Sequence, residues 1–340
     1  MRLRDLATQA GVHPSTVSRV LNGDPSVRVS EETRAKLLRL AAATGYRPNR
    51  LARSLKMQRT RIVGMLVPDV TNPFFAVLLR AVEDAASEAG YNVILCNTDD
   101  SPARLETHLR VLSEGHVDGL LLATAHRRDP AVESLRRRRL PYVLVNRRRD
   151  DPDDSSVVPD DRLGAQLAVE HLVALGHRRI AHIAAAPDIS TSALRLEGFR
   201  VALAAHGRPA VPELVVEGAL TEAGGERAMR RLLALPPGRC PTAVFAVNDL
   251  AALGAIAAAQ DAGRRVPEDV SVVGYNDLPS LGRARPPLTS VRVPLYEMGR
   301  RAVHLLIGML GRVGAAEPAH VVLPVELVVR ASTAPPKESP

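Results

Sequence analysis

The feature that most limits what this chain can fold into is a repeated alternation of short apolar runs with helix-compatible segments, which begins near residue 61. The first apolar run ends at Pro68, as a buried parallel strand does. Such alternation is typical of a parallel α/β sheet. The pattern restarts after Pro159, which predicts two similar halves and a ligand cleft beyond the carboxyl ends of their strands. The further elements expected are helices at 74–89, 103–115, 163–175 and 194–207, an Arg-rich helix before residue 142, and strands at 91–96, 117–123, 142–145, 179–185, 214–217, 243–246 and 270–274.

Three short amphipathic segments in the first sixty residues predict a helix-turn-helix. The expected helices are 4–10, 14–21, and a third that begins after the N-cap Ser30 and ends at Gly45. A tight turn at Gly11 separates the first two. In this motif the second helix enters the major groove of DNA. The alternative is a small helical bundle whose outer face is merely polar.

The charge distribution also favours a nucleic-acid partner. Residues 1–60 hold 12 Lys or Arg and 4 Asp or Glu, whereas the remaining 280 residues hold 33 of each sign. The net charge of +8 therefore lies entirely in the first sixth of the chain. A basic end on a neutral body is typical of a DNA-binding arm, although a solubilising surface is the alternative.

Polar side chains around the second segment are the expected DNA contacts. Arg19 can bond a guanine bidentately, and base readout is expected to depend on Arg19 and Ser15 because Pro14 has no polar side chain. The remaining hydroxyl and amide groups are expected mainly at phosphates, which position a protein without specifying sequence. They are Thr16, Ser18, Asn22 and Thr33.

A second set of polar residues directly follows the predicted strands of the body and forms the candidate effector site. A ring of amide, carboxylate and Arg groups suits a sugar, since each hydroxyl both donates and accepts a hydrogen bond. Phe75 can pack on a ring face. Each polar residue could instead be a strand-end cap or a turn former. The candidates are Asp69, Asn146, Arg147, Thr191, Arg195, Asn248, Asn276 and Asp277.

Several motifs resemble the lactose/galactose-repressor family of bacterial regulators, and the resemblance covers roughly residues 2–332. In the first sixty residues they are Ala10-Gly11-Val12, Thr16-Val17-Ser18-Arg19-Val20-Leu21-Asn22-Gly23, Val29-Ser30-Glu31-Glu32-Thr33-Arg34 and Gly45-Tyr46-Arg47-Pro48-Asn49. In the body they include Asn72-Pro73-Phe74-Phe75, Arg195-Leu196-Glu197-Gly198-Phe199, Asn248-Asp249 and Val273-Gly274-Tyr275. The chain departs from the family in having His13 at a usual serine cap, Asn146 and Asn276 where Asp is common, and Leu220 in place of an aromatic residue.

The resemblance implies an α/β protein with a small all-α N-terminal domain: a helix-turn-helix headpiece (1–48), a hinge helix and linker (49–60), and a two-subdomain parallel α/β core like that of periplasmic binding proteins (61–332). The chain would cross between subdomains near Val158, Leu288 and Pro318. That places the N-subdomain at about 61–158 and 290–317, and the C-subdomain at about 159–289 and 318–332. The tail, 333–340, is expected to be disordered.

The resemblance also implies functional roles. Positions matching Asn146, Arg195, Asn248 and Asn276 contact the effector in the family. The hinge residues Asn49, Ala52 and Leu55 are expected to contact double-stranded operator DNA, where the hinge folds as a pair from two subunits and Leu55 wedges into the minor groove. A plain linker is the alternative for this segment.

Other function classes are disfavoured. The chain lacks the Gly-x-Gly-x-x-Gly, Walker A and Gly-x-Ser-x-Gly motifs, so we expect neither an enzyme nor a cofactor. His171, His177 and His182 lack zinc-motif spacing and are expected to be structural. Two cysteines and the absence of an 18-residue apolar run indicate a reduced, cytoplasmic protein without a membrane segment. The lack of a leucine heptad favours a homodimer.

The expected function is a repressor controlled by a sugar. Two alternatives remain open: a cytosolic sugar-binding protein without DNA function, and a purine-type corepressor-dependent repressor.

Overall fold

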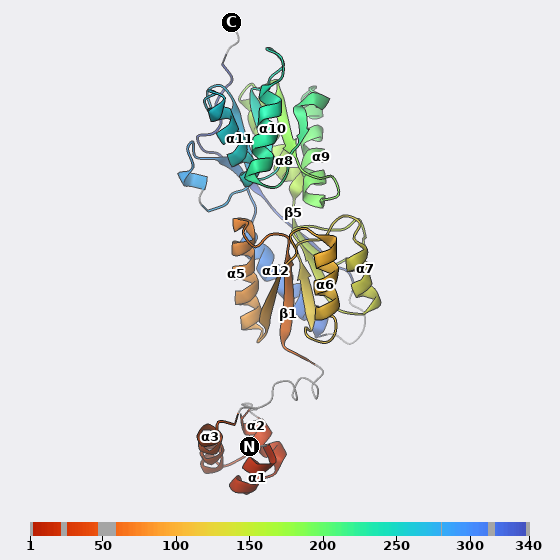
Figure 1. The fold of residues 1–340 in the computed structure, drawn as a ribbon, viewed down its shortest axis with the longest axis vertical. Helices are drawn as coiled ribbons and strands as arrows, with labels where there is room; N and C mark the ends of the chain where they lie inside the picture. Colours follow the sequence, from red (N-terminus) through yellow and green to blue (C-terminus); the bar gives the residue numbers. More distant parts are fainter. Residues whose placement is uncertain (1–2, 22–25, 47–58, 280, 312–316, 338–340) are drawn as a thin grey trace. The chain divides into compact units, whose positions relative to one another are not determined.

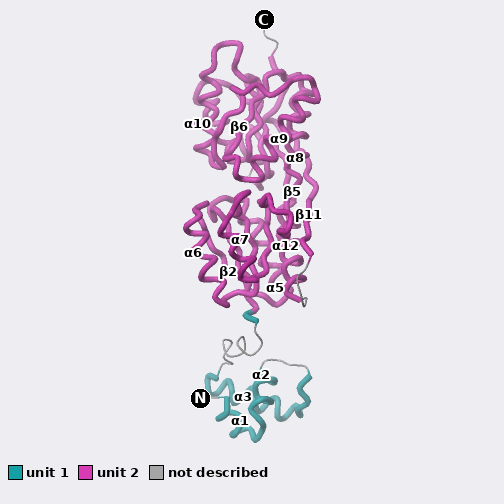
Figure 2. The backbone as a smooth tube through the Cα atoms, turned by 90° about the vertical axis from the view of Figure 1, so that its right-hand side faces the viewer, with its two compact units in different colours: residues 1–60 teal, residues 61–340 magenta. Residues whose placement is uncertain are grey.

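The computed structural model describes residues 3–21, 26–46, 59–279, 281–311 and 317–337. The chain divides into two compact units, residues 1–60 and 61–340 (Figure 2). Within the described ranges, no helix combines the length and apolar character needed to cross a membrane.

The first unit is a three-helix domain with a small apolar core. Its helices are α1 (Leu3–Ala10), α2 (Pro14–Leu21) and α3 (Glu31–Thr44). Leu6, Val17 and Leu37, one from each helix, are fully buried against one another. The turn between α1 and α2 passes through Gly11 at φ +69°, a backbone conformation that glycine adopts without a steric penalty. The predicted helix-turn-helix is confirmed.

The second unit contains two six-stranded sheets, each covered by helices on both faces (Figure 1). The first sheet has the order β11-β5-β4-β3-β1-β2, and all of its paired strands run parallel. Helices α5 and α12 cover one face, and α6 and α7 cover the other. The elements are β1 (Ile62–Val67), α5 (Pro73–Glu88), β2 (Asn92–Asn97), α6 (Pro102–Leu112), β3 (Gly119–Leu122), α7 (Pro130–Arg137), β4 (Tyr142–Val145), β5 (Ser156–Pro159), α12 (Leu295–Leu310) and β11 (His320–Leu323).

The second sheet has the order β12-β10-β9-β8-β6-β7 and is parallel except for the β10–β12 pair. Helices α8 and α9 pack together, as do α10 and α11. The elements are α8 (Asp161–Ala174), β6 (Ile180–Ala184), α9 (Ser190–Ala205), β7 (Val215–Glu217), α10 (Glu222–Leu233), β8 (Ala243–Ala246), α11 (Asp249–Asp261), β9 (Ser271–Asn276), β10 (Thr289–Arg292) and β12 (Glu326–Val328), with short 3₁₀ turns at Pro212–Leu214 and Leu281–Arg283.

The strand sequences explain why both sheet faces are covered. Successive side chains on a strand point to opposite faces, so an unbroken apolar run requires helices on both sides. In β1, Val63 and Met65 belong to the core shared with α5, whereas Leu66 belongs to the core under α6 and α7. The predicted two-half parallel α/β architecture is confirmed.

Two of the expected crossings between the subdomains are wrong in position. Thr289–Arg292 forms β10 of the second sheet, so the chain returns to the first sheet only after Arg292. His320–Leu323 forms β11 beside β5, so the last crossing follows Leu323 and not Pro318. A short strand does not reveal in its own residues which sheet will pair with it, because that choice depends on hydrogen bonds to distant segments.

The expectation of a disordered tail from residue 333 is also wrong for the described part of that segment. Thr333 Oγ1 lies 2.9 Å from His171 Nε2, and the carbonyl oxygen of Ala334 accepts a hydrogen bond from His177 Nε2 at 2.9 Å. Lys337 forms an ion pair with Asp269 at 2.5 Å. These polar contacts tie the segment to the second subdomain.

Candidate functional site

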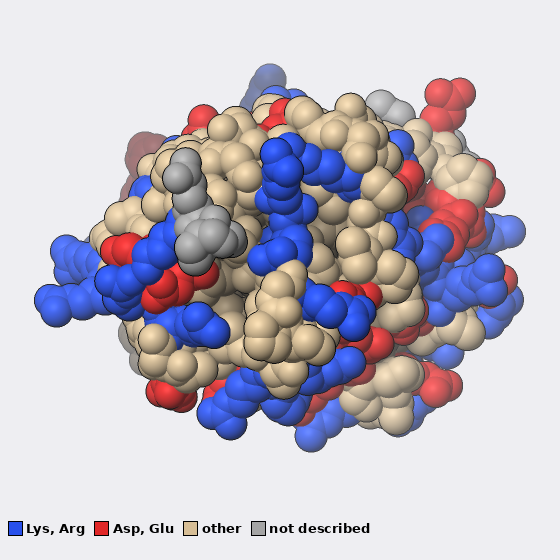
Figure 3. Space-filling view, turned by 90° about the horizontal axis from the view of Figure 1, so that it is seen from above, with Lys and Arg blue, Asp and Glu red and all other residues tan. Residues whose placement is uncertain are grey.

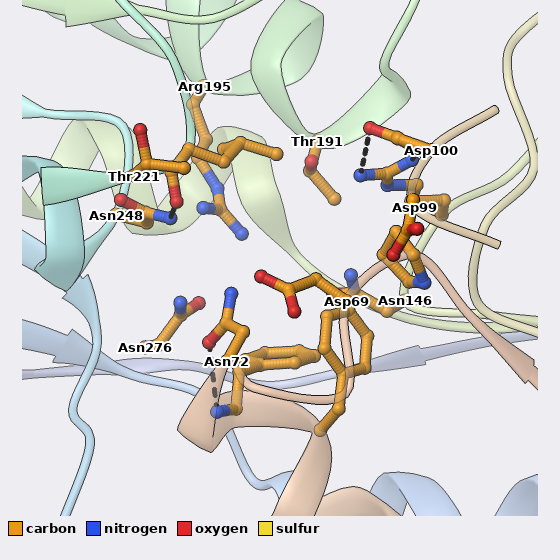
Figure 4. A pocket seen from close by; sticks show the side chains of 15 residues that line it. Asp69, Asn72, Asp99, Asp100, Asn146, Thr191, Arg195, Thr221, Asn248 and Asn276 are labelled. Carbon is orange, nitrogen blue, oxygen red and sulfur yellow. Dashed lines mark hydrogen bonds and ion pairs between the residues drawn. The ribbon is translucent and has the colours of Figure 1, made fainter. Parts of the chain in front are cut away.

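A cavity of about 400 Å³ lies between the two subdomains of the core, at the carboxyl ends of both sheets (Figure 4). Eight of the nine residues proposed for effector binding line it. They are Asp69, Phe75, Asn146, Arg147, Thr191, Arg195, Asn248 and Asn276. The two halves of the chain therefore bring this set together, as the strand-end rule predicts.

Arg195, on α9, is held from three sides at the cavity wall. Its Nε donates to Asp161 Oδ1 at 2.8 Å and its Nη1 donates to the carbonyl oxygen of Val247 at 2.6 Å. Its guanidinium carbon lies 3.6 Å from the ring centroid of Tyr275, a cation–π contact. Gly164 makes room for that ring, because a Cβ there would lie 2.3 Å from the Tyr275 hydroxyl. Burial raises the pKa of Asp161, and the opposing charge of Arg195 counters this effect.

Arg147 is fixed in a different way. Its Nη1 and Nη2 donate to the two carboxylate oxygens of Asp100, at 2.7 and 3.3 Å, and both residues line the cavity. Its side chain is only 3 % exposed. A bidentate pair of this kind sets the guanidinium plane and leaves little freedom for reorientation.

Two amide oxygens in the cavity wall lack a partner within the described part of the chain. Asn146 Oδ1 and Asn276 Oδ1 are buried and accept no hydrogen bond there. Both residues have positive φ, +65° and +115°, directly after or at the end of a strand. A buried acceptor without a donor is costly, so these two oxygens favour a ligand that supplies hydroxyl or amine hydrogens.

The other amides of the wall already cap helices. Asn72 Oδ1 accepts from the Phe74 N–H at the start of α5, and Asn248 Oδ1 accepts from the Ala251 N–H at the start of α11. Thr221 caps α10 in the same manner. Several helix N-termini thus face the cavity and give its wall a partial positive potential that favours ligand oxygens.

Asp277 is the exception among the nine candidates, because the prediction that it lines the effector site is wrong. Its carboxylate forms ion pairs with Arg292 Nε at 2.7 Å and Arg330 Nη2 at 2.6 Å. Asp277 does not line the cavity. Its φ of +55° follows the +115° of Asn276, and this sharp turn separates the two side chains.

Sequence reasoning missed several polar residues of the cavity. Asp99 and Asp100 follow β2, so the strand-end rule that selected Asp69 applies to them equally. Asn72 and Thr221 carry N-cap signatures, which the sequence also shows. These four residues complete the polar ring.

Polar contacts beside the cavity join the two subdomains. His126 Nδ1 lies 2.9 Å from Asp188 Oδ2, and the Arg127 N–H donates to the carbonyl oxygen of Asp188 at 2.8 Å. The Arg148 N–H donates to Ser190 Oγ at 2.9 Å. The other ring nitrogen of His126 lies 3.7 Å from Asp100, the partner of Arg147. The contacts at the cavity edge are therefore continuous with those between subdomains.

The three histidines considered for a metal site lie in structural positions. His182 stacks between Phe199 and Phe245, and burial lowers its pKa to about 4. His177 bonds Thr242 and Ser271. In the described ranges, no group of three or more His, Cys, Asp or Glu side chains could hold a metal ion.

The candidate DNA-binding residues lie on the first unit. Ser15 and Arg19 are exposed on α2, and Thr16 and Ser18 are partly exposed beside them. Thr33 is less available for a phosphate contact than expected, because its hydroxyl lies 2.9 Å from Oγ of Ser30, the residue that caps α3. Asn22, Asn49, Ala52 and Leu55 lie outside the described residues. On the face of the protein in Figure 3, by contrast, basic and acidic side chains lie interspersed, as the neutral charge balance after residue 60 leads one to expect.

Comparison with known proteins decides the family. Residues 2–49 match the bacterial regulatory proteins of the lacI family, and residues 169–333 match a periplasmic binding protein-like domain. The transcriptional repressor PurR of Mannheimia succiniciproducens is 36 % identical over 331 residues, covering 97 % of this chain and 98 % of that protein. The chain belongs to the lacI family.

Further relatives agree with this membership. The ribose operon repressor of Escherichia coli is 38 % identical over 306 residues, covering 90 % of this chain and 92 % of that repressor. A lac repressor dimer bound to operator and an anti-inducer matches with a TM-score of 0.87 and 29 % identity, covering 98 % of this chain and 99 % of that one. The interpretation as a DNA-binding transcriptional regulator with a small-molecule site, and not an enzyme, is confirmed.

Proposed function

We propose that this lacI-family regulator is a repressor that binds a pseudo-palindromic operator as a homodimer and is controlled by an uncharged sugar. The observation that carries the effector assignment is the pair of unpartnered amide oxygens, Asn146 Oδ1 and Asn276 Oδ1, in a cavity that also holds a buried Arg195. Sugar hydroxyls can donate to the first two and accept from the third. The eight cavity residues predicted from the sequence are the proposed contacts.

Charge favours an uncharged ligand. The cavity wall holds three carboxylates, Asp69, Asp99 and Asp100, and two guanidiniums, Arg147 and Arg195. Arg195 is balanced by Asp161 behind it, Arg147 by Asp100, and Asp99 by Arg104, which leaves the carboxylate of Asp69 in excess. A phosphate or uronate would meet this excess negative charge and is disfavoured. Among similar solved structures, one holds cellobiose and one from Enterococcus faecium holds ribose, which supports a sugar.

A purine is the second candidate ligand. Phe74 and Phe75 both line the cavity, with ring centroids 4.9 Å apart, and a planar base could pack on them. Among the described residues that line the cavity, however, Phe74 and Phe75 are the only aromatic ones, and Leu220 is aliphatic.

A thermal-shift screen of the full chain tests the effector class. Sugars, sugar phosphates and purines would be compared at equal concentration. A ligand at 100 times its Kd stabilises by about 2.7 kcal/mol, which raises Tm by a few degrees. We expect neutral sugars to shift Tm and their phosphates to have no effect. A shift with purines alone would overturn the sugar assignment and keep the regulator.

DNA binding should depend steeply on salt. For a dimer that contacts about eight phosphates, a plot of the logarithm of the association constant against the logarithm of the salt concentration has a slope near −7. The measurement is fluorescence anisotropy of a labelled operator, selected from random DNA for binding to this protein, between about 50 and 200 mM salt. A chain without DNA affinity would instead be the sugar-binding protein of the alternative hypothesis.

The proposed dimer face lies at the β2 edge of the first sheet. Val70, Ile94 and Leu95 are 48, 38 and 37 % exposed, although all three are large and apolar. The Val70 N–H donates to Asn97 Oδ1, which places Val70 beside the end of β2. An exposed apolar edge strand is a liability that a partner subunit would cover.

The contacts that join His126, Arg127 and Arg148 to the second subdomain support a route for control. An effector that changes the angle between subdomains must make or break these bonds. Coupling of this kind is reciprocal and typically about 1–3 kcal/mol. Because operator DNA and two free cysteines fit the cytoplasm, we place the regulator there.

A further inference from the structure

His13 directly precedes the DNA-binding helix α2 (Pro14–Leu21) and caps its N-terminus. Its carbonyl oxygen accepts hydrogen bonds from the N–H groups of Thr16 and Val17, at 2.9 and 3.3 Å. Its ring nitrogen Nδ1 accepts a third, from the Ser15 N–H at 3.2 Å. The imidazole thus performs the N-cap role that a serine, threonine or asparagine side chain usually performs.

These contacts determine where the hydrogen on the ring lies. A backbone N–H can only donate, so Nδ1 must offer its lone pair and carry no hydrogen. The neutral ring therefore has its hydrogen on Nε2. Ser15 Oγ lies 2.7 Å from the same Nδ1. Since an unprotonated nitrogen cannot donate, the Ser15 hydroxyl must donate its hydrogen to His13.

The consequence concerns what Ser15 can offer to DNA. Its only hydroxyl hydrogen is bound within the protein, while the oxygen lone pairs remain available on an exposed residue. In the major groove, adenine N6 and cytosine N4 are amino donors, whereas guanine and thymine present only acceptors. We propose that His13 is a specificity-determining positioning residue that makes Ser15 an obligate acceptor, so that Ser15 contacts the amino group of an adenine or a cytosine and not a base acceptor.

This inference rests on the DNA-binding function of α2. It adds which side chains on that helix donate hydrogen bonds to bases and which accept them. Pro14, between His13 and Ser15, has no polar side chain, and Arg19 can only donate. Of the two residues expected to read bases, Ser15 is therefore an acceptor and Arg19 a donor. Ser15 is expected to contact a base amino group, and Arg19 is expected to contact base acceptors.

Selection from a double-stranded DNA library with randomised half-sites tests the proposal. The full-length wild type is compared with Ser15→Ala, His13→Ala and His13→Asn. The base pair of the half-site whose preference disappears in Ser15→Ala marks the Ser15 contact. Replacing its adenine with purine, or its cytosine with 2-pyrimidinone, removes the amino group and should weaken wild-type binding about three- to tenfold without affecting Ser15→Ala. His13→Ala should tolerate this replacement better than wild type, because the freed hydroxyl can then donate to a base acceptor. His13→Asn should behave as wild type, since Asn Oδ1 can accept both hydrogens and cap the helix.

The outcomes separate this proposal from the function on which it rests. A wild-type protein that enriches no sequence would overturn the operator-binding function. Full wild-type affinity for the site that lacks the amino group, or an unchanged sequence preference in Ser15→Ala, would overturn only the role of His13. The wild-type and Ser15→Ala results decide this even if His13→Ala fails to fold. An unchanged loss of affinity on removal of the amino group in a folded His13→Ala protein would also reject it.

Discussion

Replacing Arg195 with alanine is expected to weaken effector binding strongly and to destabilise the core. A hydrogen bond from a charged donor contributes about 1.5–3 kcal/mol, so effector affinity should fall about 10- to 150-fold. The same substitution leaves Asp161 buried without its cation, since the two side chains are only 3 and 1 % exposed. Breaking a buried ion pair in this way costs about 3–5 kcal/mol. Urea unfolding and ligand titration with the best sugar of the screen measure the two effects.

A matched variant separates binding from stability. The double substitution Asp161→Asn with Arg195→Gln removes both charges and keeps a hydrogen-bonding pair of similar shape. We expect it to recover most of the lost stability but not the effector affinity. Operator affinity without effector should stay near the wild-type value in both proteins, because the DNA-binding helix belongs to the other compact unit. Unchanged sugar affinity in the double variant would show that the effector binds elsewhere.

Asp249 is expected to make the stability of the regulator fall as pH rises from 5 to 8. Burial raises the pKa of this carboxyl from 3.8 to about 7. Its stabilising contribution is fully present below the unfolded value of 3.8 and is lost as pH rises through the folded value. One pKa unit corresponds to 1.36 kcal/mol, so the loss between pH 5 and 8 is about 2–3 kcal/mol. The difference in unfolding free energy between Asp249→Asn and wild type across this range measures it, because His182, whose pKa burial lowers, contributes with the opposite sign.

Asp249→Asn is the control, because it mimics the protonated carboxyl. Asp249 Oδ2 accepts from the Leu278 N–H at 2.9 Å, and Oδ1 lies 2.5 Å from Ser290 Oγ. An amide can keep both bonds, with its oxygen toward Leu278 and its NH₂ donating to Ser290. The variant should match wild type at pH 5 and exceed its stability at pH 8. Parallel pH profiles for the two proteins would exclude Asp249 as the titrating group.

Local sequence patterns were sufficient for most elements. Helices Pro14–Leu21 and Glu31–Thr44 and strands Tyr142–Val145 and Ala243–Ala246 begin and end where the sequence analysis placed them. Proline at the first helical position, a serine cap and a C-terminal glycine mark such boundaries within a few residues of chain. The same locality explains why eight cavity residues could be named, since most of them lie at or just after a strand end or in the first turn of a helix; Arg195, in the second turn of α9, is the exception.

Tertiary structure alone decided which sheet received each short strand and which carboxylate met which cation. The sequence by itself determined the helix-turn-helix, the two α/β halves and the strand ends where polar residues gather. It could not separate Asn276, which lines the cavity, from its neighbour Asp277, which pairs with Arg292 and Arg330. It also could not show that Asp100 would hold Arg147. The physical reason is that periodicity and capping act between residues a few positions apart, whereas ion pairs and strand pairing join groups that are distant in the chain and adjacent only after folding.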